Sequence, residues 1–343
     1  MNKNESIASS INTATIRNVE SIPPQQSLTF ASSGEHLIYS DNKEDFTVSN
    51  TSKNYLWGFG VGTSYKDVEM YHLLYNGNDH SPLRVGIAVQ NTNASGTSAT
   101  ITYKCATANL NSAGDGLALT VTPNALRTFL NASYQTKTIS GQTSAFLCGY
   151  SGSFASGCPK FAFVRARIKA SVSSGIYLRA FAIGSDNYNN VGSIFSISTV
   201  DPGQVGHFCG ELPYNQKTVS VDASINKSYH LFGSTTNNTN EYDTAYTTPK
   251  SPGQTQLIGN YGVRYTFNIT NASGKVINIF PDWAIGNRTS ASLLYKLNSG
   301  AWTVGSIITS NMMWSLSLGT SSTATFSMYL AGGNCGNYIV YFS

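Results

Sequence analysis

Residues able to do acid–base or metal chemistry gather in one stretch, "FASSGEHLIYSDNKEDF", from Phe30 to Phe46. It brings Glu35, His36 and Asp41 together in a chain with only 11% charged residues. Successive side chains of a regular strand point to opposite faces, so Glu35 and His36 cannot hold one metal ion together. We therefore interpret the stretch as a first strand followed by the polar turn "SDNKED".

The other chemistry-bearing residues form no recognisable catalytic motif. The sequence lacks the G-x-S-x-G, H-E-x-x-H, P-loop and Rossmann patterns. His207 and Cys209 in "GHFCG" share a strand face, which suits either a nucleophile–base pair or, as we favour, two packing neighbours. No two of the 17 acidic residues stand out as the carboxylate pair that glycoside hydrolysis needs. We expect no enzymatic activity, no cofactor and no metal site.

Two groups of residues are candidates for contact with a glycan or another polymer. Arg165, Arg167 and Lys169 alternate in "FVRARIKAS", which places them on one face of a strand. They form either an anion-binding stripe or, as we favour, the solvent side of an amphipathic strand. Trp283 and Trp302 are candidates for stacking on a sugar ring, with core or turn packing as the alternative that we favour. A net charge of +4 spread over the chain argues against a nucleic-acid partner.

Five cysteines are candidates for disulfides: Cys105, Cys148, Cys158, Cys209 and Cys335. They show no C-x-x-C pair and no zinc-like spacing with histidine. Cys148 and Cys158 bracket the loop "GYSGSFASG", which a disulfide would close. An odd count leaves at least one thiol free or bonded to another molecule. The alternative is that most of them are small buried hydrophobic residues.

The elements that must position these residues are mostly strands. With 41% hydrophobic and 12% aromatic residues, the 343-residue chain has an all-β composition. We expect two β-sandwich, jelly-roll-like domains with one short helix, Pro123–Tyr134, which Thr122 caps. The clearest expected strands are Glu35–Tyr39, Tyr55–Val61, Leu83–Gln90, Ala99–Cys105, Leu117–Thr122, Phe161–Ala170, Ile176–Ile183 and Ser193–Val200.

The predicted organisation is a flexible N-terminal arm at 1–29, a first sandwich at 30–215 and a second at 216–343. The arm segment "INTATIRNV" is rich in β-branched residues, so it is either a disordered tag or a strand donated to a neighbouring subunit. The residues of the arm expected to make assembly contacts are Ile11, Thr13, Thr15, Ile16 and Val19. No segment is apolar enough to span a bilayer, and "MNKNESIASSINTATIRNVE" lacks the apolar region of a secretory signal.

Three motifs carry a resemblance to a known family. "GEHLIYSD" at 34–41, "LLYNGNDHSPLRVGIAVQNT" at 73–92 and "GNYGVRYTFNIT" at 259–270 resemble a β-rich region of Gram-positive, Paenibacillus-like surface proteins. These are labelled stalk-domain or copper-amine-oxidase-N-terminal-domain-containing proteins. The resemblance implies a pair of β-sandwiches on a cell or spore surface, without established catalysis. The metal-related label belongs to a separate domain that this chain lacks, so no copper site is carried over. General features also resemble endospore appendage or coat subunits.

We therefore expect a non-enzymatic structural protein of a bacterial cell or spore surface. It would assemble with copies of itself into a filament, appendage or coat, through arm strand addition and intersubunit disulfides. It would act outside the cell without a classical signal peptide and without a transmembrane segment. One alternative is a carbohydrate-binding or adhesive module that contacts cell-wall or host glycan. Another is a phage or virus structural protein.

Overall fold

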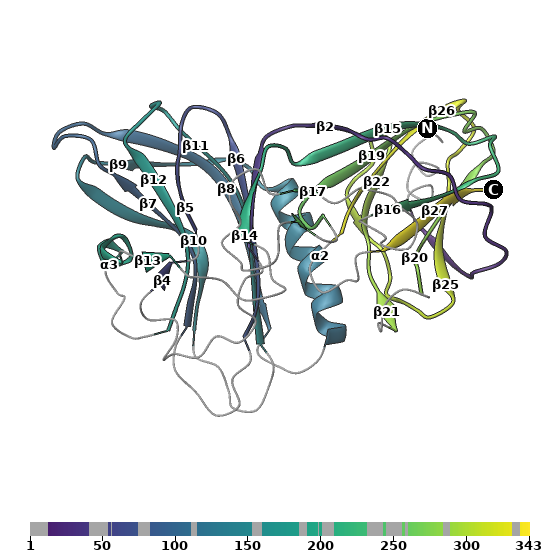
Figure 1. Cartoon of the computed structure of the whole chain (residues 1–343), viewed down its shortest axis with the longest axis horizontal. Coiled ribbons are helices and arrows are strands. Elements are labelled where there is room, and N and C mark those ends of the chain that lie inside the picture. The colour runs from purple at the N-terminus through teal and green to yellow at the C-terminus, as the bar shows by residue number, and fades with distance from the viewer. Residues whose placement is uncertain are drawn as a thin grey trace, which may run out of the picture. The chain divides into compact units, whose positions relative to one another are not determined.

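The computed structural model describes residues 13–40, 54–55, 57–74, 83–110, 115–152, 160–184, 191–197, 199–200, 209–231, 243–244, 256–257, 260–283, 289–330 and 337–343. These residues form an all-β fold of the sandwich type, as predicted. The chain divides into two compact units (Figure 1). Unit 1 draws on 1–34, 214–243 and 257–343, and unit 2 on 35–213 and 244–256. The predicted domain boundaries fell at 29/30 and 215/216.

Unit 2 is built on two packed sheets. One has the order β10-β7-β12-β5 and the other the order β14-β3-β6-β11-β8-β9, in which β3 and β6 run parallel. Ile87 and Leu178 of the first sheet and Val164 of the second pack in the core between them. The strands of the first sheet are β5 (Trp57–Gly60), β7 (Leu83–Asn91), β10 (Thr143–Gly152) and β12 (Ile176–Gly184). Those of the second are β3 (His36–Ser40), β6 (Lys66–Leu74), β8 (Ala99–Leu110), β9 (Gln135–Ile139), β11 (Lys160–Ala170) and β14 (Cys209–Leu212).

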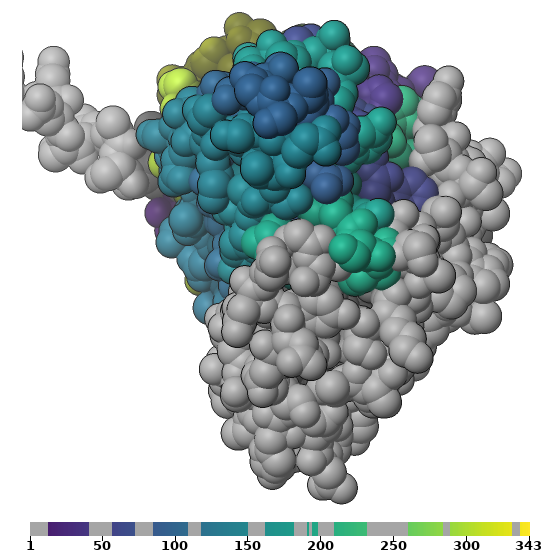
Figure 2. Space-filling view, turned by 90° about the vertical axis from the view of Figure 1, so that its left-hand side faces the viewer, coloured from purple at the N-terminus to yellow at the C-terminus, as the bar shows by residue number. Residues whose placement is uncertain are grey.

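Within the described residues, two helices lie on the sheets of unit 2. The long helix α2 (Asp115–Asn131) packs along β8 and β11 on the outer face of the six-stranded sheet (Figure 1). The short helix α3 (Gly192–Ser196) packs Ile194 against Ala88 and Phe181 of the four-stranded sheet. A parallel pair, β4 (Asn54–Tyr55) and β13 (Thr199–Val200), completes the unit. The blue-to-teal part of the chain that carries β7 to β12 makes up most of the coloured surface in Figure 2.

Unit 1 also consists of two sheets, with the orders β1-β25-β20-β27-β16 and β2-β15-β19-β26-β22-β23. Its core includes Phe267 and Phe326, and a stacked pair of Trp314 and Tyr338. The first sheet consists of β1 (Thr15–Asn18), β16 (Ser228–Leu231), β20 (Val276–Pro281), β25 (Met312–Ser317) and β27 (Tyr338–Phe342). The second consists of β2 (Ala31–Ser33), β15 (Gln216–Asp222), β19 (Arg264–Thr270), β22 (Leu294–Leu297), β23 (Thr303–Val304) and β26 (Thr323–Tyr329). Two further short pairs are β17 (Asp243–Thr244) with β18 (Gln256–Leu257) and β21 (Ser290–Ala291) with β24 (Ile308–Thr309).

The predicted helix and two predicted strands need correction. The helix begins at Asp115, so Pro123 lies inside it and Thr122 is buried within it rather than capping it. The apolar run Leu117–Thr122, predicted as a strand, is helical, because a short apolar run fits either state until its packing partner is known. The predicted strand Ser193–Val200 is helix α3 followed by the short β13. None of the described helices is both long enough and apolar enough to cross a membrane.

Candidate functional site

The N-terminal arm forms strand β1, which lies at the edge of the five-stranded sheet of unit 1. It pairs antiparallel with β25 of the same chain, with Thr15 opposite Ser315 and Arg17 opposite Met313. All four residues of β1 are exposed, and Ile16 keeps 40% of its accessible surface. The arm strand is therefore attached mainly through its backbone. The arm was predicted to be flexible, but from Thr13 onward it has a defined course.

The direction of each amide in β1 follows from the hydrogen bond next to it. The N–H of Val19 donates to the carbonyl of Asn311 at 2.7 Å, and continuing the register places these two residues opposite each other. In an antiparallel ladder, hydrogen-bonded pairs alternate with non-bonded pairs. The N–H groups of Arg17 and Thr15 therefore point toward β25, and that of Ile16 points away from it.

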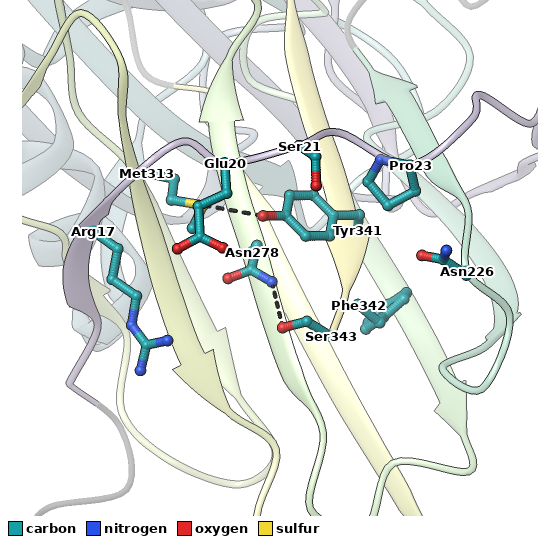
Figure 3. Close-up of a pocket in the computed structure, with 10 residues that line it drawn as sticks. All are labelled: Arg17, Glu20, Ser21, Pro23, Asn226, Asn278, Met313, Tyr341, Phe342 and Ser343. Carbon is teal, nitrogen blue, oxygen red and sulfur yellow. Dashed lines mark hydrogen bonds between the residues drawn. The ribbon is translucent and has the colours of Figure 1, made fainter.

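Beyond β1 the arm crosses the outer face of the sheet (Figure 3). It is fixed again at the opposite edge, where Ser228 of β16 donates its N–H to the carbonyl of Pro24 and its hydroxyl to the carbonyl of Pro23, at 3.1 and 2.8 Å. The N–H of Gln26 donates to the carbonyl of Ser228 at 2.9 Å. One segment of about a dozen residues thus contacts both edges of the same sheet.

A pocket of about 250 Å³ lies between the arm and the sheet. From the sheet it is lined by Asn278, Tyr341 and Ser343, and from the arm by Arg17 and Glu20, among others (Figure 3). The lining is largely polar. Within it, Asn278 donates a hydrogen bond to the hydroxyl of Ser343 at 3.0 Å. Burial raises the pKa of Tyr341, and the Glu20 carboxylate adds to the effect while Arg17 opposes it.

The predicted assembly residues are only partly within the described chain. Thr13 is exposed just before β1, Thr15 and Ile16 belong to β1, and Val19 follows it half-buried. Ile11 lies outside the described residues. The β-branched composition of this segment left a disordered tag and a donated strand as alternatives, and it gave no sign that β1 pairs with β25 of the same chain.

Helix α2 covers Arg165, the first residue of the basic stripe of β11, whereas Arg167 and Lys169 stay partly exposed. Arg165, Arg167 and Lys169 share one face of β11, as predicted, but Arg165 is fully buried and its guanidinium lies 5.3 Å from the ring centre of Phe129. Lys169 lies 4.6 Å from the ring centre of Tyr65. Both interpretations of the stripe required exposure, so both are wrong for Arg165. The covering helix is the reason, and alternation within β11 could not reveal it.

The buried guanidinium is paired with carboxylates on the neighbouring strand β6. Arg165 donates to Asp67 at 2.7 Å and to Glu69 at 3.0 Å, and the side chains of all three are at most 1% exposed. Arg167 donates to Asp67 at 2.6 Å from a partly exposed position. We call Asp67, Glu69, Arg165 and Arg167 the ionic cluster. The sequence signal was present but missed: two acids alternate in "KDVEMYH" at the same spacing as the two arginines.

Glu69 is the least satisfied member of the ionic cluster. Its Oε2 accepts from Arg165, whereas its Oε1 has no hydrogen-bond partner among the residues that the structure describes. Burial raises the pKa of Glu69 to about 7, although the charge of Arg165 opposes this. A carboxyl with such a pKa exchanges a proton near neutral pH, inside the fold.

The raised pKa of Glu69 predicts that stability falls as pH rises from about 4.5 to about 7. The folded state holds a proton in this range that the unfolded state, with a pKa of 4.5, releases. The contribution of Glu69 to the free energy of unfolding is therefore fully present below pH 4.5 and is lost as the pH rises through 7. It amounts to on the order of 3 kcal/mol. Urea unfolding of the wild type and of Glu69→Gln, followed by circular dichroism from pH 5 to pH 8, measures the difference. The free energy of unfolding of Glu69→Gln should change less with pH than that of the wild type. An equal dependence on pH in the two proteins would contradict the prediction.

The two tryptophans proposed for glycan contact are half-buried and engaged in packing. Trp283 donates its indole N–H to the carbonyl of Met312 at 3.3 Å. The ring of Trp302 lies 5.3 Å from that of Tyr329, at an interplanar angle of 51°. They come from different loops of unit 1. The glycan role therefore stays a prediction that depends on their partly exposed faces.

Three of the five cysteines lie within the described chain, and all three are free thiols: Cys105, Cys148 and Cys209. Cys158 and Cys335 lie outside the described residues. The loop-closing disulfide predicted between Cys148 and Cys158 is absent, because Cys148 is a free thiol. Cys148 is instead hydrogen-bonded to Cys105 on another strand.

The stretch that begins at Phe30 contributes His36 to an ion-pair site. His36 Nδ1 lies 2.6 Å from Glu211 Oε1, and Lys66 Nζ lies 2.8 Å from the same oxygen. Burial opposes ionisation of Glu211, but its bonds to Lys66 and His36 outweigh this and lower its pKa. Asp41 and His207 lie outside the described residues. Within the described ranges, no group of three or more His, Cys, Asp or Glu side chains is arranged to hold a metal ion.

Comparison with known proteins gives no family. No family model matches the chain, and none of the curated proteins matches it. Among solved structures, the chain aligns with dimeric latent PorU from Porphyromonas gingivalis at 7% identity and a TM-score of 0.19. The alignment covers 94% of this chain and 23% of that chain. A TM-score this low supports no argument about function. The resemblance to Gram-positive stalk-domain proteins stays a prediction.

Proposed function

We propose that this protein is a structural subunit that joins copies of itself by exchanging the N-terminal arm. We further propose that it acts on a bacterial cell or spore surface as part of a filament, appendage or coat. The observation that supports the proposal is the exposure of β1 and its position at the edge of the sheet. It is a four-residue, wholly exposed edge strand, attached to β25 mainly through its backbone. Such a strand can leave one sheet and join another without opening a hydrophobic core.

Exchange would use the same contacts that the arm makes within its own chain. When β1 leaves, the edge of β25 presents unpaired N–H and C=O groups, which are a template for a strand of another copy. The incoming arm would adopt the same register, because main-chain hydrogen bonds supply affinity and alternate side chains supply specificity. Contacts of this head-to-tail kind form a fibre when the rotation between copies does not close.

Two proline variants one residue apart test the exchange. Arg17→Pro removes an N–H that points toward β25, and it should weaken docking of the arm about 100-fold, which corresponds to roughly 3 kcal/mol. Ile16→Pro removes an N–H that points away from β25, a position where edge strands tolerate proline. We expect ordered polymers from the wild type and Ile16→Pro, and monomers from Arg17→Pro. Sedimentation velocity and electron microscopy of the purified proteins measure this.

Arg17→Ala controls for the loss of charge and should polymerise like the wild type. Equal polymerisation of Arg17→Pro and the wild type would overturn arm exchange. A wild type that stays monomeric at every concentration would overturn self-assembly itself. In that case, binding of the monomer to cell-wall polysaccharide, with loss on Trp302→Ala, would favour the adhesive alternative.

A further inference from the structure

Two cysteines on different sheets of unit 2 meet at one corner of its sandwich. Cys105 lies on β8 of the six-stranded sheet and Cys148 on β10 of the four-stranded sheet. Strands β8 and β10 approach each other, with Cα atoms within 8 Å, and Cys105 packs against the core cluster that contains Cys148. The thiol of Cys148 donates a hydrogen bond to the sulfur of Cys105. The two side chains are therefore neighbours in the core of unit 2.

A β-bulge in β10 turns Cys148 toward this contact. The register with β7 shifts between Phe146 and Cys148, which leaves Leu147 as the extra residue. Without the bulge, alternation would send Leu147 to the core and Cys148 to the opposite face. With it, Leu147 and Cys148 are both buried in the same core cluster.

Glycine at the neighbouring positions makes the bulge sterically feasible. A Cβ on Gly149, whose φ is +153°, would lie 2.2 Å from the carbonyl oxygen of Val85. A Cβ on Gly86 would lie 2.5 Å from the carbonyl oxygen of Cys148. The position of Cys148 is thus built into the backbone of two adjacent strands.

We propose that Cys105 and Cys148 form a thiol pair that a low-molecular-weight disulfide oxidises to a bond between the two sheets. Cys105 is half-buried, so a small disulfide can reach it, whereas Cys148 is only 6% exposed. The hydrogen bond from Cys148 lowers the pKa of Cys105 and raises that of Cys148, with burial raising it further. Cys105 is therefore the attacking thiol and Cys148 the resolving thiol.

The oxidation of Cys105 and Cys148 proceeds through two successive thiol–disulfide exchanges. The Cys105 thiolate attacks one sulfur of oxidised glutathione, breaks its S–S bond and releases one glutathione thiolate, which takes up a proton. Cys148 then loses its proton and attacks the Cys105 sulfur, which breaks the mixed disulfide and releases a second glutathione. Both protein thiols are oxidised, and one glutathione disulfide is reduced to two thiols.

Incubation of the full chain with oxidised glutathione, followed by alkylation and peptide mass spectrometry, tests the proposal. The wild type should yield a peptide linked through Cys105 and Cys148. Cys148→Ser should instead accumulate glutathione on Cys105, and Cys105→Ser should leave Cys148 at least about tenfold less modified. Cys209→Ala, which removes another buried described thiol, should react like the wild type. Closing a loop of about 43 residues should slow hydrogen exchange of β8 and β10 amides on the order of 100-fold.

Three results would overturn the inference. One is a stable glutathione adduct on Cys105 of the wild type without a linked peptide. Another is linkage of Cys148 to a cysteine other than Cys105. The third is modification of Cys148 in Cys105→Ser as fast as modification of Cys105 in Cys148→Ser. The test does not depend on self-assembly, because every readout is available from the monomer.

Discussion

Replacing Arg165 with methionine is expected to lower the free energy of unfolding of unit 2 by about 3–5 kcal/mol. The change leaves Glu69 without its partner in a fully buried site, and Asp67 with Arg167 alone. Removing one partner of a buried ion pair is much more costly than replacing both, because the carboxyl groups of Asp67 and Glu69 stay buried and lose the hydrogen bonds from the guanidinium. Hydrogen exchange of the β6 and β11 amides reports the loss locally, and unit 1 amides serve as an internal reference.

Two further variants separate charge burial from simple packing. Arg165→Met combined with Glu69→Met removes both partners of one pair, so it should recover stability to within about 1–2 kcal/mol of the wild type. Lys169→Met removes a half-buried cation from the same face of the same strand and should cost under about 1 kcal/mol. If Arg165→Met is no more harmful than Lys169→Met, water reaches the ionic cluster and the desolvation argument is wrong.

Replacing Trp314 with alanine is expected to destabilise unit 1 by about 3–5 kcal/mol. Its indole is fully buried and stacks on Tyr338 at an interplanar angle of 2°. The indole N–H donates to the carbonyl of Ser306 at 2.8 Å, so the variant loses both packing and a hydrogen bond. Because Trp314 lies opposite Ile16 in the register, docking of β1 should weaken as well.

The matched variant for this position is Trp314→Phe. It keeps an aromatic ring against Tyr338 and loses the hydrogen bond to Ser306, so it should cost clearly less than alanine. Urea unfolding gives the free-energy difference, and hydrogen exchange of β25 and β1 amides gives the effect on the arm. A small cost for alanine, below about 1 kcal/mol, would show that the cavity collapses or that the indole contributes little.

Local patterns in the sequence predicted much of the sheet structure. Alternation correctly placed Arg165, Arg167 and Lys169 on one face of a strand, because side-chain direction depends only on the local backbone. Alternation could not show whether that face is open, since helix α2 comes from a different segment. The start of the helix was also wrong, because Pro123 was assumed to occupy its first position and lies in its interior.

Contacts between distant segments account for the rest of what was missed. Cys105 and Cys148 are 43 residues apart, and their meeting depends on a single extra residue in β10. Nothing in the spacing of cysteines marks a bulge, so the sequence pointed to Cys158 instead. The edge that receives β1 was hidden for the same reason: its pairing residues, such as Thr15 and Ser315, are 300 positions apart.

That separation has a consequence for synthesis on the ribosome. Unit 2 lies largely between the segments of unit 1 in the chain, so most of it emerges before β25 exists. At about 5–20 residues per second, β1 spends roughly 15–60 s outside the ribosome before its own β25 follows. If the arm exchanges between copies as proposed, neighbouring nascent chains on one messenger would carry unpaired arms during that interval. Closer spacing of ribosomes would then favour pairing between chains.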